Sequence, residues 1–446
     1  MTKTRILIKK TPELVEKEVI LKGWINARRD MGKISFIDLR DRSAVAQVVL
    51  VPQELGKSAD LVKELRPEYI VEIKGVVKAR GEKQLNKDMP TGTVEILASE
   101  LKIIEKAETL PFELGSKQNL DVYLDYLPLN LRDEKNRAIF KVASEIVEGF
   151  RSHLYKEDFT EIQFPKLTAA ATEGGANVFK LDYFKNKAFL GQSPQFYKQI
   201  MVGVYERVFT VGTVFRAEKH ATSRHTSEYT SLDFEMGFID SYTDIMQMLQ
   251  ENLRFICERL KKECSYEFKL LGATIPEVSK EIPVLKMSEA QEILDKEYGQ
   301  NCSGQIDLEP EHEKLLYKWS KDKHNSDFVF VTHYPTKKRP WYTMPDPKSP
   351  EETLSFDLLF RGVEITTGGQ RIHNYEMLKK NIEKFGLKSE DFSYYLQAFK
   401  FGMPPEGGIG MGFERLTSRF LGIDNIKQAT LFPRDLTRID DRLSKN

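Results

Sequence analysis

Apolar residues in the first hundred positions come in short runs with the texture of β-strands. The runs span residues 18–26, 33–41, 44–51, 69–77 and 92–104. A single segment, residues 57–65, has helical spacing instead and lies between the third and fourth runs. The pattern predicts five strands with one helix inserted between the third and the fourth.

This order of elements is the plan of an OB-fold, a small five-stranded β-barrel. Barrels of this type often bind single-stranded nucleic acid on their open face. A barrel that serves only for packing fits the same pattern, because a fold does not determine a function. We therefore assign residues 1–104 to an OB-fold domain whose role the pattern alone leaves open.

From residue 136 onward the pattern changes to long helices and buried strands. One helical stripe comprises Ile139, Ala143, Ile146, Phe150 and Leu154. Helices are also predicted at 241–263, at 287–297 and from about residue 412, and strands at 161–168, 208–215, 232–239, 328–335 and 355–369. Pro165 suits an edge strand or an interface better than a central strand. Residues 136–446 therefore read as an α+β domain on a largely antiparallel sheet, with 105–135 as a hinge.

Composition is that of an ordinary globular protein of 446 residues, with 40% hydrophobic and 11% aromatic content. Lysine plus arginine and aspartate plus glutamate both number 67, so a nucleic-acid partner would need a local basic patch. The three cysteines, Cys257, Cys264 and Cys302, have neither disulfide nor zinc spacing, and the N-terminus lacks the apolar core of a signal peptide. These two features lead us to expect a cytoplasmic protein. We expect no membrane partner, because no apolar run reaches roughly 18 residues.

Residues 215–238 concentrate charges of both signs between two apolar runs. A solvated hairpin is one interpretation. The flanks, however, have the character of buried strands, which would hold the charged loop in place for a polyanionic ligand. No GxxxxGK[ST] loop is present, the glycines of 407–415 do not follow the dinucleotide pattern, and His220 and His225 lack the spacing of a zinc pair.

Four segments taken together carry a family resemblance. They are "FRAE" at 215–218, "RHTSEY" at 224–229, "RGVEITTGGQRIH" at 361–373 and "GIGMGFERL" at 408–416. These resemble the signature motifs of class II aminoacyl-tRNA synthetases. Closer features resemble aspartyl-tRNA synthetases of the archaeal and eukaryotic type: "TEGGANVFKLDYF" at 172–184, "GQSPQFYKQ" at 191–199, "RPWYTMPD" at 339–346 and "LFPRDLTRIDDRL" at 431–443.

The resemblance implies a binding site for ATP, in which Arg216 would hold the α-phosphate and Arg224 and His225 the outer phosphates. Arginine suits this role because its planar fork binds two oxygens and stays charged. Further ATP-binding residues implied by the motifs are Glu218 at the adenine amino group, Tyr229 and Arg415 on its two faces, Gly412, and Glu364. Glu364 and Thr367 match the ligands of Mg²⁺, which prefers oxygen donors. Catalysis would rest on Arg216, Glu364 and Arg415.

The same resemblance implies a binding site for L-aspartate. Lys198 and Arg371 match residues that pair with the substrate's side-chain carboxylate. Glu173, Gln195 and Asp233 match residues around the substrate's α-amino group, and Arg216 and Thr367 also match residues of the amino-acid site. Glu173 belongs to "TEGGA" at 172–176, which resembles a mobile loop that closes over the bound amino acid.

For tRNA, the resemblance implies that the barrel reads the anticodon through Arg28, Phe36 and Gln47. An aromatic face and hydrogen-bonding side chains are how single-stranded RNA is commonly read. The stripe from Ile139 to Leu154 and the strand with Pro165 resemble the family's dimerisation element, so a homodimer is expected.

Three activities remain open from the sequence. The first is attachment of aspartate to tRNA, on its own tRNA or on asparagine tRNA as well. The second is an asparaginyl-tRNA synthetase, a sister that usually lacks the lysine matched by Lys198. The third is a paralogue that charges no tRNA, against which the complete set of motifs argues.

Overall fold

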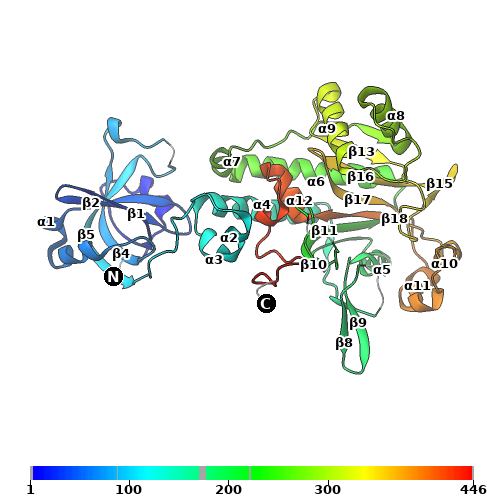
Figure 1. Cartoon of the computed structure of the whole chain (residues 1–446), viewed down its shortest axis with the longest axis horizontal. Helices are drawn as coiled ribbons and strands as arrows, with labels where there is room; N and C mark the ends of the chain where they lie inside the picture. The colour runs from blue at the N-terminus through cyan, green and yellow to red at the C-terminus, as the bar shows by residue number, and fades with distance from the viewer. Residues whose placement is uncertain (1–3, 88, 170–176, 220–221, 444–446) are drawn as a thin grey trace. The chain divides into compact units, whose positions relative to one another are not determined.

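The computed structural model describes residues 4–87, 89–169, 177–219 and 222–443. The chain divides into two compact units, Met1–Glu113 and Leu114–Asn446 (Figure 1). The division falls inside the segment 105–135 that the sequence marks as a hinge. The finer three-part division drawn from the sequence stays a prediction.

The first unit is a closed five-stranded barrel with strand order β1-β2-β3-β5-β4. Its strands are β1 (Glu18–Met31), β2 (Ile34–Arg40), β3 (Val45–Leu50), β4 (Ile70–Ala79) and β5 (Val94–Glu105). Neighbouring strands pair antiparallel except β3 and β5, which pair parallel. Alternate residues point inward, among them the fully buried Leu21, Ile37, Val48 and Ile96. The predicted OB-fold is confirmed.

The helix expected at 57–65 is different in kind. A four-residue α-helix, α1 (Pro52–Leu55), ends at Gly56, whose φ of 51° lies in the left-handed region. The chain then continues as the 3₁₀ helix η2 (Gly56–Glu64). Val62 and Leu65 from this stretch are buried in the barrel core. The predicted helix at 57–65 is therefore present, as a 3₁₀ helix that follows the short α1 after Gly56.

The second unit contains an eight-stranded sheet with the order β12-β13-β16-β17-β18-β11-β10-β6. Its strands are β6 (Thr160–Glu161), β10 (Arg207–Phe215), β11 (Glu228–Gly237), β12 (Val284–Lys286), β13 (Phe328–Thr332), β16 (Ser355–Phe360), β17 (Val363–Gln370) and β18 (Glu406–Gly412). The central pairs are antiparallel, and the two outermost pairs, β12 with β13 and β10 with β6, are parallel. The predicted antiparallel α+β architecture is confirmed.

Three helices pack on one face of this sheet and form its main core (Figure 1). They are α4 (Glu134–Lys156), α6 (Tyr242–Glu263) and α12 (Phe413–Leu421). Ile146 of α4, Leu249 of α6 and Phe420 of α12 are fully buried in the same cluster as Phe209 and Phe234 of the sheet. The predicted stripe on α4 is therefore a core-facing stripe.

Shorter elements complete the second unit. Its other helices are α2 (Leu120–Asp125), α3 (Leu127–Asn130), α5 (Gln195–Tyr205), α7 (Ser265–Leu271), α8 (Met287–Tyr298), α9 (Pro310–His324), α10 (Tyr375–Lys384) and α11 (Ser393–Lys400). Two small sheets contain β7 (Leu167–Thr168), β8 (Lys180–Tyr183), β9 (Asn186–Leu190), β14 (Pro345–Asp346) and β15 (Ser349–Thr353). The strand expected at 161–168 is split into β6 and β7, with Pro165 in the gap between them.

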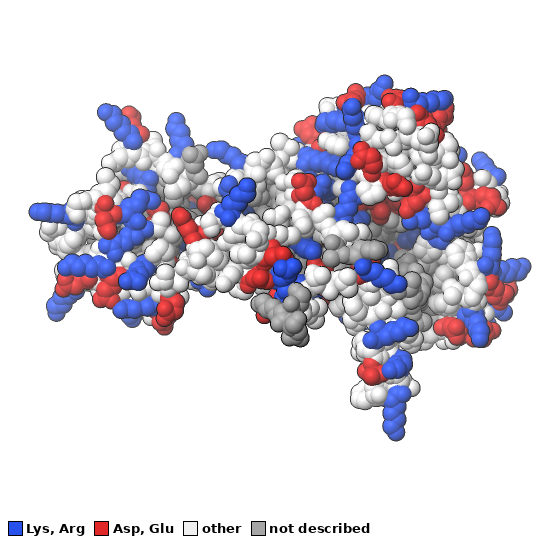
Figure 2. All heavy atoms as spheres, viewed as in Figure 1, with Lys and Arg blue, Asp and Glu red and all other residues white. Residues whose placement is uncertain are grey.

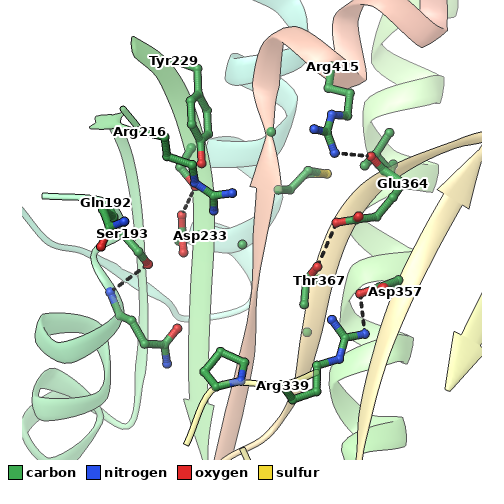
Figure 3. A pocket seen from close by; sticks show the side chains of 18 of the residues that line it. Gln192, Ser193, Arg216, Tyr229, Asp233, Arg339, Asp357, Glu364, Thr367 and Arg415 are labelled. Carbon is green, nitrogen blue, oxygen red and sulfur yellow. Dashed lines mark hydrogen bonds and ion pairs between the residues drawn. The ribbon is translucent and has the colours of Figure 1, made fainter. Parts of the chain in front are cut away.

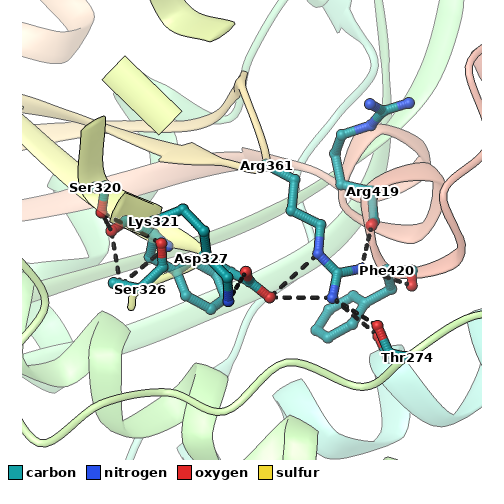
Figure 4. A network of polar contacts seen from close by, with 9 residues as sticks. Thr274, Ser320, Lys321, Ser326, Asp327, Arg361, Arg419 and Phe420 are labelled. Atoms are coloured by element: carbon teal, nitrogen blue, oxygen red, sulfur yellow. Dashed lines mark hydrogen bonds and ion pairs between the residues drawn. The ribbon is translucent and has the colours of Figure 1, made fainter. Parts of the chain in front are cut away.

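Arg361 ties the turn between β16 and β17 to the helices (Figure 4). Its guanidinium lies 3.1 Å from Asp327 Oδ2 and donates to the carbonyl oxygens of Arg419, Phe420 and Thr274. The first two carbonyls belong to the last turn of α12, where a positive charge also complements the helix dipole. This one side chain thus fixes the end of α12 against the sheet.

Charge is spread rather than segregated on the surface. Figure 2 shows Lys and Arg intermixed with Asp and Glu over the visible face of each unit, in keeping with the equal totals of 67. Among the described residues, no helix is both long enough and apolar enough to cross a membrane.

Candidate active site

A cavity of about 350 Å³ lies over strands β16, β17, β18 and β11 (Figure 3). It brings together the described residues that the sequence predicted for ATP, amino acid and metal. These are Gln195, Lys198, Arg216, Glu218, Arg224, His225, Tyr229, Asp233, Glu364, Thr367, Arg371, Gly412 and Arg415. Glu173 was also predicted, but it lies outside the described residues. Segments up to about 200 positions apart therefore converge on one cavity.

Strand β11 lines the cavity with polar side chains, because successive side chains of a strand point to opposite faces of the sheet. Leu232 and Phe234 are fully buried in the helix-covered core, so Asp233 and Glu235 between and after them point to the opposite face. The neighbouring strand β18 places Gly408 beside them, where an added Cβ would lie 2.3 Å from Glu235 Oε2. Glycine at this position leaves the space that the carboxylate occupies.

Lys198, on α5, reaches across the sheet to β11 and β18. Its Nζ lies 2.8 Å from Asp233 Oδ2 and 3.0 Å from Glu235 Oε2, and it donates to the Ile409 carbonyl oxygen at 2.7 Å. The side chain is 1% exposed. The ammonium group therefore donates to Asp233 and to the Ile409 carbonyl oxygen, and it also lies within ion-pair distance of Glu235.

Arg371, just after β17, faces the same carboxylate from the other side. Its Nε donates to Glu235 Oε1 at 2.7 Å, and its Nη2 donates to the Gly408 carbonyl oxygen at 2.9 Å. Burial works against its charge, yet Glu235 raises the pKa of Arg371 above its usual value. Glu235 thus holds Lys198 and Arg371 together, and the two cations form one anion-binding end of the cavity.

Gln195 begins α5 and lines the cavity beside Lys198. Its Nε2 donates to Gln199 Oε1 at 2.9 Å, one helical turn further along. Both glutamines are buried, at 3% and 0% exposure. The orientation of the Gln195 amide is therefore fixed by a buried partner rather than by solvent.

Arg216 stands at the start of the charged loop between β10 and β11. Its backbone N–H donates to the Ser227 carbonyl oxygen at 2.9 Å, which closes the loop. The Arg216 guanidinium lies 5.6 Å from the centroid of the Tyr229 ring, within cation–π range. Glu218, Tyr229 and Arg415 line the same part of the cavity. The solvated-hairpin interpretation is therefore incomplete, because the loop turns charged side chains into a cavity.

Arg224 is held by a carboxylate that the sequence did not single out. Its Nη1 donates to Glu313 Oε2 of α9 at 3.2 Å, and the same oxygen accepts from the Glu364 backbone N–H at 3.3 Å. Burial, and then the nearby Glu364, raise the pKa of Glu313 to about 7. The pair orients Arg224 toward the cavity next to Glu364.

His225 shares this corner of the cavity. Its Nδ1 is hydrogen-bonded to Thr222 Oγ1 at 2.7 Å. Burial is the main cause of a lowered pKa, and Arg415, Arg216 and Arg224 lower the pKa of His225 further against the pull of Glu218. The imidazole is therefore neutral at pH 7 in the cavity as it stands.

Glu364 and Thr367 form the oxygen-rich wall expected to hold Mg²⁺ (Figure 3). The Thr367 hydroxyl donates to Glu364 Oε1 at 2.9 Å, and Arg415 Nη1 donates to the Glu364 carbonyl oxygen at 2.8 Å. Although burial opposes ionisation, Arg415 and the Thr367 hydroxyl hold the pKa of Glu364 below its usual value. An ionised carboxylate beside a hydroxyl is a donor set that fits Mg²⁺.

In the parts of the chain that the structure describes, no three His, Cys, Asp or Glu side chains are grouped to hold a metal. An ion at Glu364 and Thr367 would thus complete its shell with substrate or water oxygens, as Mg²⁺ in phosphate sites generally does.

Arg339 and Asp357 form a further buried pair in the cavity wall (Figure 3). Arg339 Nη2 lies 2.8 Å from Asp357 Oδ1, and Asp357 stands opposite Thr367 in the β16–β17 register. Burial raises the pKa of Asp357 to about 6, against the effect of Arg339. The pair adds an arginine and a carboxyl group beside Glu364 and Thr367. The sequence analysis assigned no role to either residue of the pair.

On the barrel, Phe36 and Gln47 lie on the outer face, as half-buried residues that alternate with core positions. Arg29, not Arg28, is paired with Phe36 in the β1–β2 register, and Arg29 also contacts Gln47 at 3.4 Å. Arg28 pairs with the buried Ile37 and donates to the Leu65 carbonyl oxygen at 3.0 Å. Arg29 rather than Arg28 therefore lies beside Phe36 and Gln47, and the anticodon role of Arg28 stays a prediction.

Comparison with known proteins places both units. A family model described as tRNA synthetases class II (D, K and N) matches residues 119–436, and one described as an OB-fold nucleic acid binding domain matches residues 19–104. The chain is 45% identical to an aspartate–tRNA(Asp/Asn) ligase of Deinococcus radiodurans, over 98% of each chain. It is 39% identical to an aspartate–tRNA(Asp) ligase of Pyrococcus abyssi, over 98% of this chain and 100% of that one.

Solved structures agree on the fold. Asparaginyl-tRNA synthetase from Pyrococcus horikoshii with asparaginyl-adenylate superposes with a TM-score of 0.90 at 30% identity, over 98% of this chain and 99% of that one. Aspartyl-tRNA synthetase from Entamoeba histolytica gives 0.85 at 30% identity, over 98% and 92%. On the matches across both units, this chain belongs to the class II tRNA synthetases, in the family of the aspartate–tRNA ligases.

Proposed function

We propose that this enzyme joins L-aspartate to tRNA in two steps, with ATP consumed and an aspartyl-adenylate formed between them. One observation carries the proposal: a single cavity has Lys198 and Arg371 buried at one end and Arg216, Arg224 and Arg415 around the other. The first pair suits a side-chain carboxylate, and the second group suits a triphosphate.

In the first step the α-carboxylate of aspartate attacks the α-phosphorus of ATP in line, and pyrophosphate leaves. No protein nucleophile takes part. Arg216 holds the α-phosphate while negative charge grows on its oxygens, and Arg224 binds the leaving phosphates. Tyr229 and Arg415 enclose the adenine, and Glu218 accepts from its amino group. The protein's contribution is therefore positioning and neutralisation of charge.

Glu364 and Thr367 would hold Mg²⁺, which would supply positive charge against the phosphates of ATP. The pairing of Glu364 with Thr367 and Arg415 supports this assignment, because it keeps the carboxylate ionised and turned to the cavity. Gly412, at the start of α12, leaves room for ATP beside Arg415.

In the second step the 3′-hydroxyl of the terminal adenosine of tRNA attacks the acyl carbon of the aspartyl-adenylate, and AMP leaves. The barrel selects the tRNA by its anticodon. Phe36 offers a stacking face, and Gln47 and Arg29 offer hydrogen bonds to base edges. Arg29 takes the place of Arg28 in this assignment, because it lies on the same face as Phe36.

Aspartate rather than asparagine is the amino acid that the site suits. Two buried cations at one end of the cavity can exchange their present partners for a substrate carboxylate, whereas the neutral amide of asparagine offers them no charge in exchange. A high structural similarity to an asparaginyl-tRNA synthetase does not alter this, because that similarity describes the fold.

The range of tRNA substrates is the finer question. The relative with 45% identity carries the name aspartate–tRNA(Asp/Asn) ligase, which favours charging of both tRNAs by this enzyme. Aspartylation of purified aspartate and asparagine tRNAs at matched salt tests this, because phosphate contacts make affinity depend on salt. Charging of both tRNAs is expected, and charging of the aspartate tRNA alone would restrict the activity.

We further infer a two-fold homodimer. Exposed apolar side chains lie on α4, on β7 and along the C-terminal segment: Tyr155, Leu167, Leu431, Phe432 and Leu436. Such side chains suit an isologous interface. Sedimentation at micromolar concentration should give a dimer, and an active monomer would contradict the inference. The cytoplasmic location stays a prediction from the sequence.

A further inference from the structure

Glu406, the first residue of β18, is a fully buried carboxyl group that the reaction described above does not use. Its Oε1 accepts a hydrogen bond from Gln199 Nε2 at 2.7 Å. Its Oε2 has no hydrogen-bond partner among the described residues. Burying a charged carboxylate whose oxygen has no donor costs free energy. Glu406 therefore either carries a proton or has a function that offsets this cost.

The hydrogen bond from Gln199 links Glu406 to the amino-acid end of the cavity. Gln199 Oε1 already receives two donors, Gln195 Nε2 at 2.9 Å and the Tyr395 hydroxyl at 3.0 Å. Because these two donors hold the amide oxygen, the amide nitrogen of Gln199 points to Glu406, to which it donates at 2.7 Å. Glu406 thus fixes Gln199, and Gln199 in turn fixes Gln195, which lines the cavity.

The charges around Glu406 are balanced without it. Lys198 and Arg371 carry two positive charges, and Asp233 and Glu235 carry two negative charges, in direct contact with them. A third carboxylate would leave this buried group with a net negative charge. A substrate with a carboxylate side chain brings another negative charge to the same place.

The protonation of Glu406 follows from these neighbours. Burial, and then the adjacent Glu235, raise the pKa of Glu406 to about 8, while Gln199, Arg371 and Lys198 act in the opposite direction. Tyr395, which also faces it, has a pKa raised well above its usual value by burial and stays neutral. Near pH 7, Glu406 therefore keeps its proton.

We propose that Glu406 is a positioning residue that orients Gln195 through Gln199, and whose proton allows the site to accept an amino acid with a carboxylate side chain. The inference rests on the aspartate site proposed above. Ionised Glu406 and the substrate carboxylate repel one another, so each disfavours the other by the same factor. Aspartate binding is therefore coupled to proton uptake by Glu406.

Aspartate-dependent ATP–pyrophosphate exchange between pH 6.5 and 9.5 tests this coupling. For the wild type, KM for aspartate should rise above about pH 8, approaching tenfold per pH unit where coupling is strong. Glu406→Gln keeps the acceptor for Gln199 and cannot ionise. Its KM for aspartate at pH 7 should stay within about threefold of the wild type, and its alkaline rise should be absent. KM for ATP should have the same pH profile in both proteins.

Glu406→Ala tests the positioning role separately. It removes the acceptor for Gln199, so KM for aspartate should increase at every pH while KM for ATP is unchanged. A lower melting temperature with an unchanged KM for aspartate would show a purely structural role and overturn the proposal.

Proton uptake provides a test that needs no variant. Calorimetric titration of the wild type with aspartate at pH 8, in two buffers of different ionisation enthalpy, should report uptake of a fraction of a proton. Absence of uptake, or the same pH profile in wild type and Glu406→Gln, would overturn the role of Glu406. Absence of any aspartate-dependent exchange at pH 7 would instead contradict the proposed function itself.

Discussion

The ammonium group of Lys198 lies 2.8 Å from Oδ2 of Asp233, and both side chains are almost completely buried. The sequence analysis assigned the two residues to opposite charges of one substrate, the side-chain carboxylate and the α-amino group. In the structure they neutralise one another. Aspartate, which carries both charges, can therefore enter by exchanging partners with an existing ion pair, without leaving an unpaired charge at either end.

The first prediction concerns the barrel. Its two neighbouring arginines, Arg29 and Arg28, allow tRNA recognition to be separated from barrel stability. Phe36→Ala should weaken tRNA binding by about 1–3 kcal/mol through loss of one base stack. Arg29→Gln should also weaken it, because Arg29 lies beside Phe36. Aminoacylation with varied tRNA concentration measures both effects, and pyrophosphate exchange without tRNA should be unchanged.

Arg28→Gln is the control for that prediction. Since Arg28 donates to the Leu65 carbonyl oxygen at the barrel's end, its replacement should lower barrel stability and leave KM for tRNA largely unaffected. A loss of exchange activity in Phe36→Ala would identify Phe36 as a core residue and refute the anticodon assignment.

The second prediction concerns the contribution of Arg361 to the free energy of unfolding. Arg361→Met removes the ion pair with Asp327 and the donors to the last turn of α12, and should lower the free energy of unfolding by about 2–3 kcal/mol. Arg442→Met is a matched control, because Arg442 is 45% exposed in its pair with Asp121 and should cost less than about 1 kcal/mol. Urea unfolding of the three proteins compares them, and equal midpoints would show that the network adds no stability.

Three buried carboxyl groups predict how stability depends on pH. Burial is the main cause that raises the pKa of Glu313 and Glu414 to about 7 and that of Glu406 to about 8. A carboxyl whose folded pKa is raised favours the folded state fully only below its unfolded pKa. That contribution is lost as pH rises through the folded value, and it is about 3 kcal/mol for Glu313 and for Glu414 and about 5 kcal/mol for Glu406.

The free energy of unfolding should therefore fall between pH 5 and pH 8. The free energy of unfolding of Glu414→Gln should fall less steeply than that of the wild type. The amide still accepts from the Thr230 backbone N–H at 2.9 Å but cannot ionise. For Glu383→Gln, at an exposed position, the free energy of unfolding should follow that of the wild type. A slope that is the same in all three proteins would mean that Glu414 is charged in the folded enzyme.

Sequence periodicity predicted the elements whose faces differ clearly in polarity. Helices α4 and α6 and strands β10 and β11 lie where the pattern placed them, because each has one apolar face buried in the same core. Strand β18 was missed. Its glycines give no alternation of apolar and polar side chains, yet close strand packing requires glycine at Gly408, where a Cβ would lie 2.1 Å from the Phe234 carbonyl oxygen.

The candidate site was predicted where motifs carry the residues and missed where partners come from elsewhere. Glu313 lies on α9, whose predominantly polar sequence gave no strong apolar stripe. Glu235 had a visible signal, because it continues the alternation of Leu232, Phe234 and Met236 on β11. A charged residue on the polar side of a buried strand had to face a cavity or a partner. Gln199 and Glu406 had no such signal, since their contact joins α5 to β18 across 207 positions.

Lys198 provides the most direct test of the central claim, that this site selects aspartate by its carboxylate. Lys198→Leu leaves Asp233 and Glu235 without one of their cations, and the loss of a buried partner costs roughly 3–5 kcal/mol. The value of kcat/KM for aspartate in pyrophosphate exchange should fall by about two to three orders of magnitude. The effect on asparagine should be smaller.

Lys338→Leu is the control within the same cavity. Lys338 lines the cavity but pairs with Asp307 at its rim and is 37% exposed, so its loss should change kcat/KM for aspartate by less than about tenfold. Thermal unfolding of each variant shows that it is folded at the assay temperature.

The deciding measurement is pyrophosphate exchange by the wild type and Lys198→Leu with aspartate and asparagine side by side. The account predicts that the wild type prefers aspartate and that the variant loses most of this preference. A wild type that prefers asparagine, or a variant in which both amino acids are weakened equally, would contradict it.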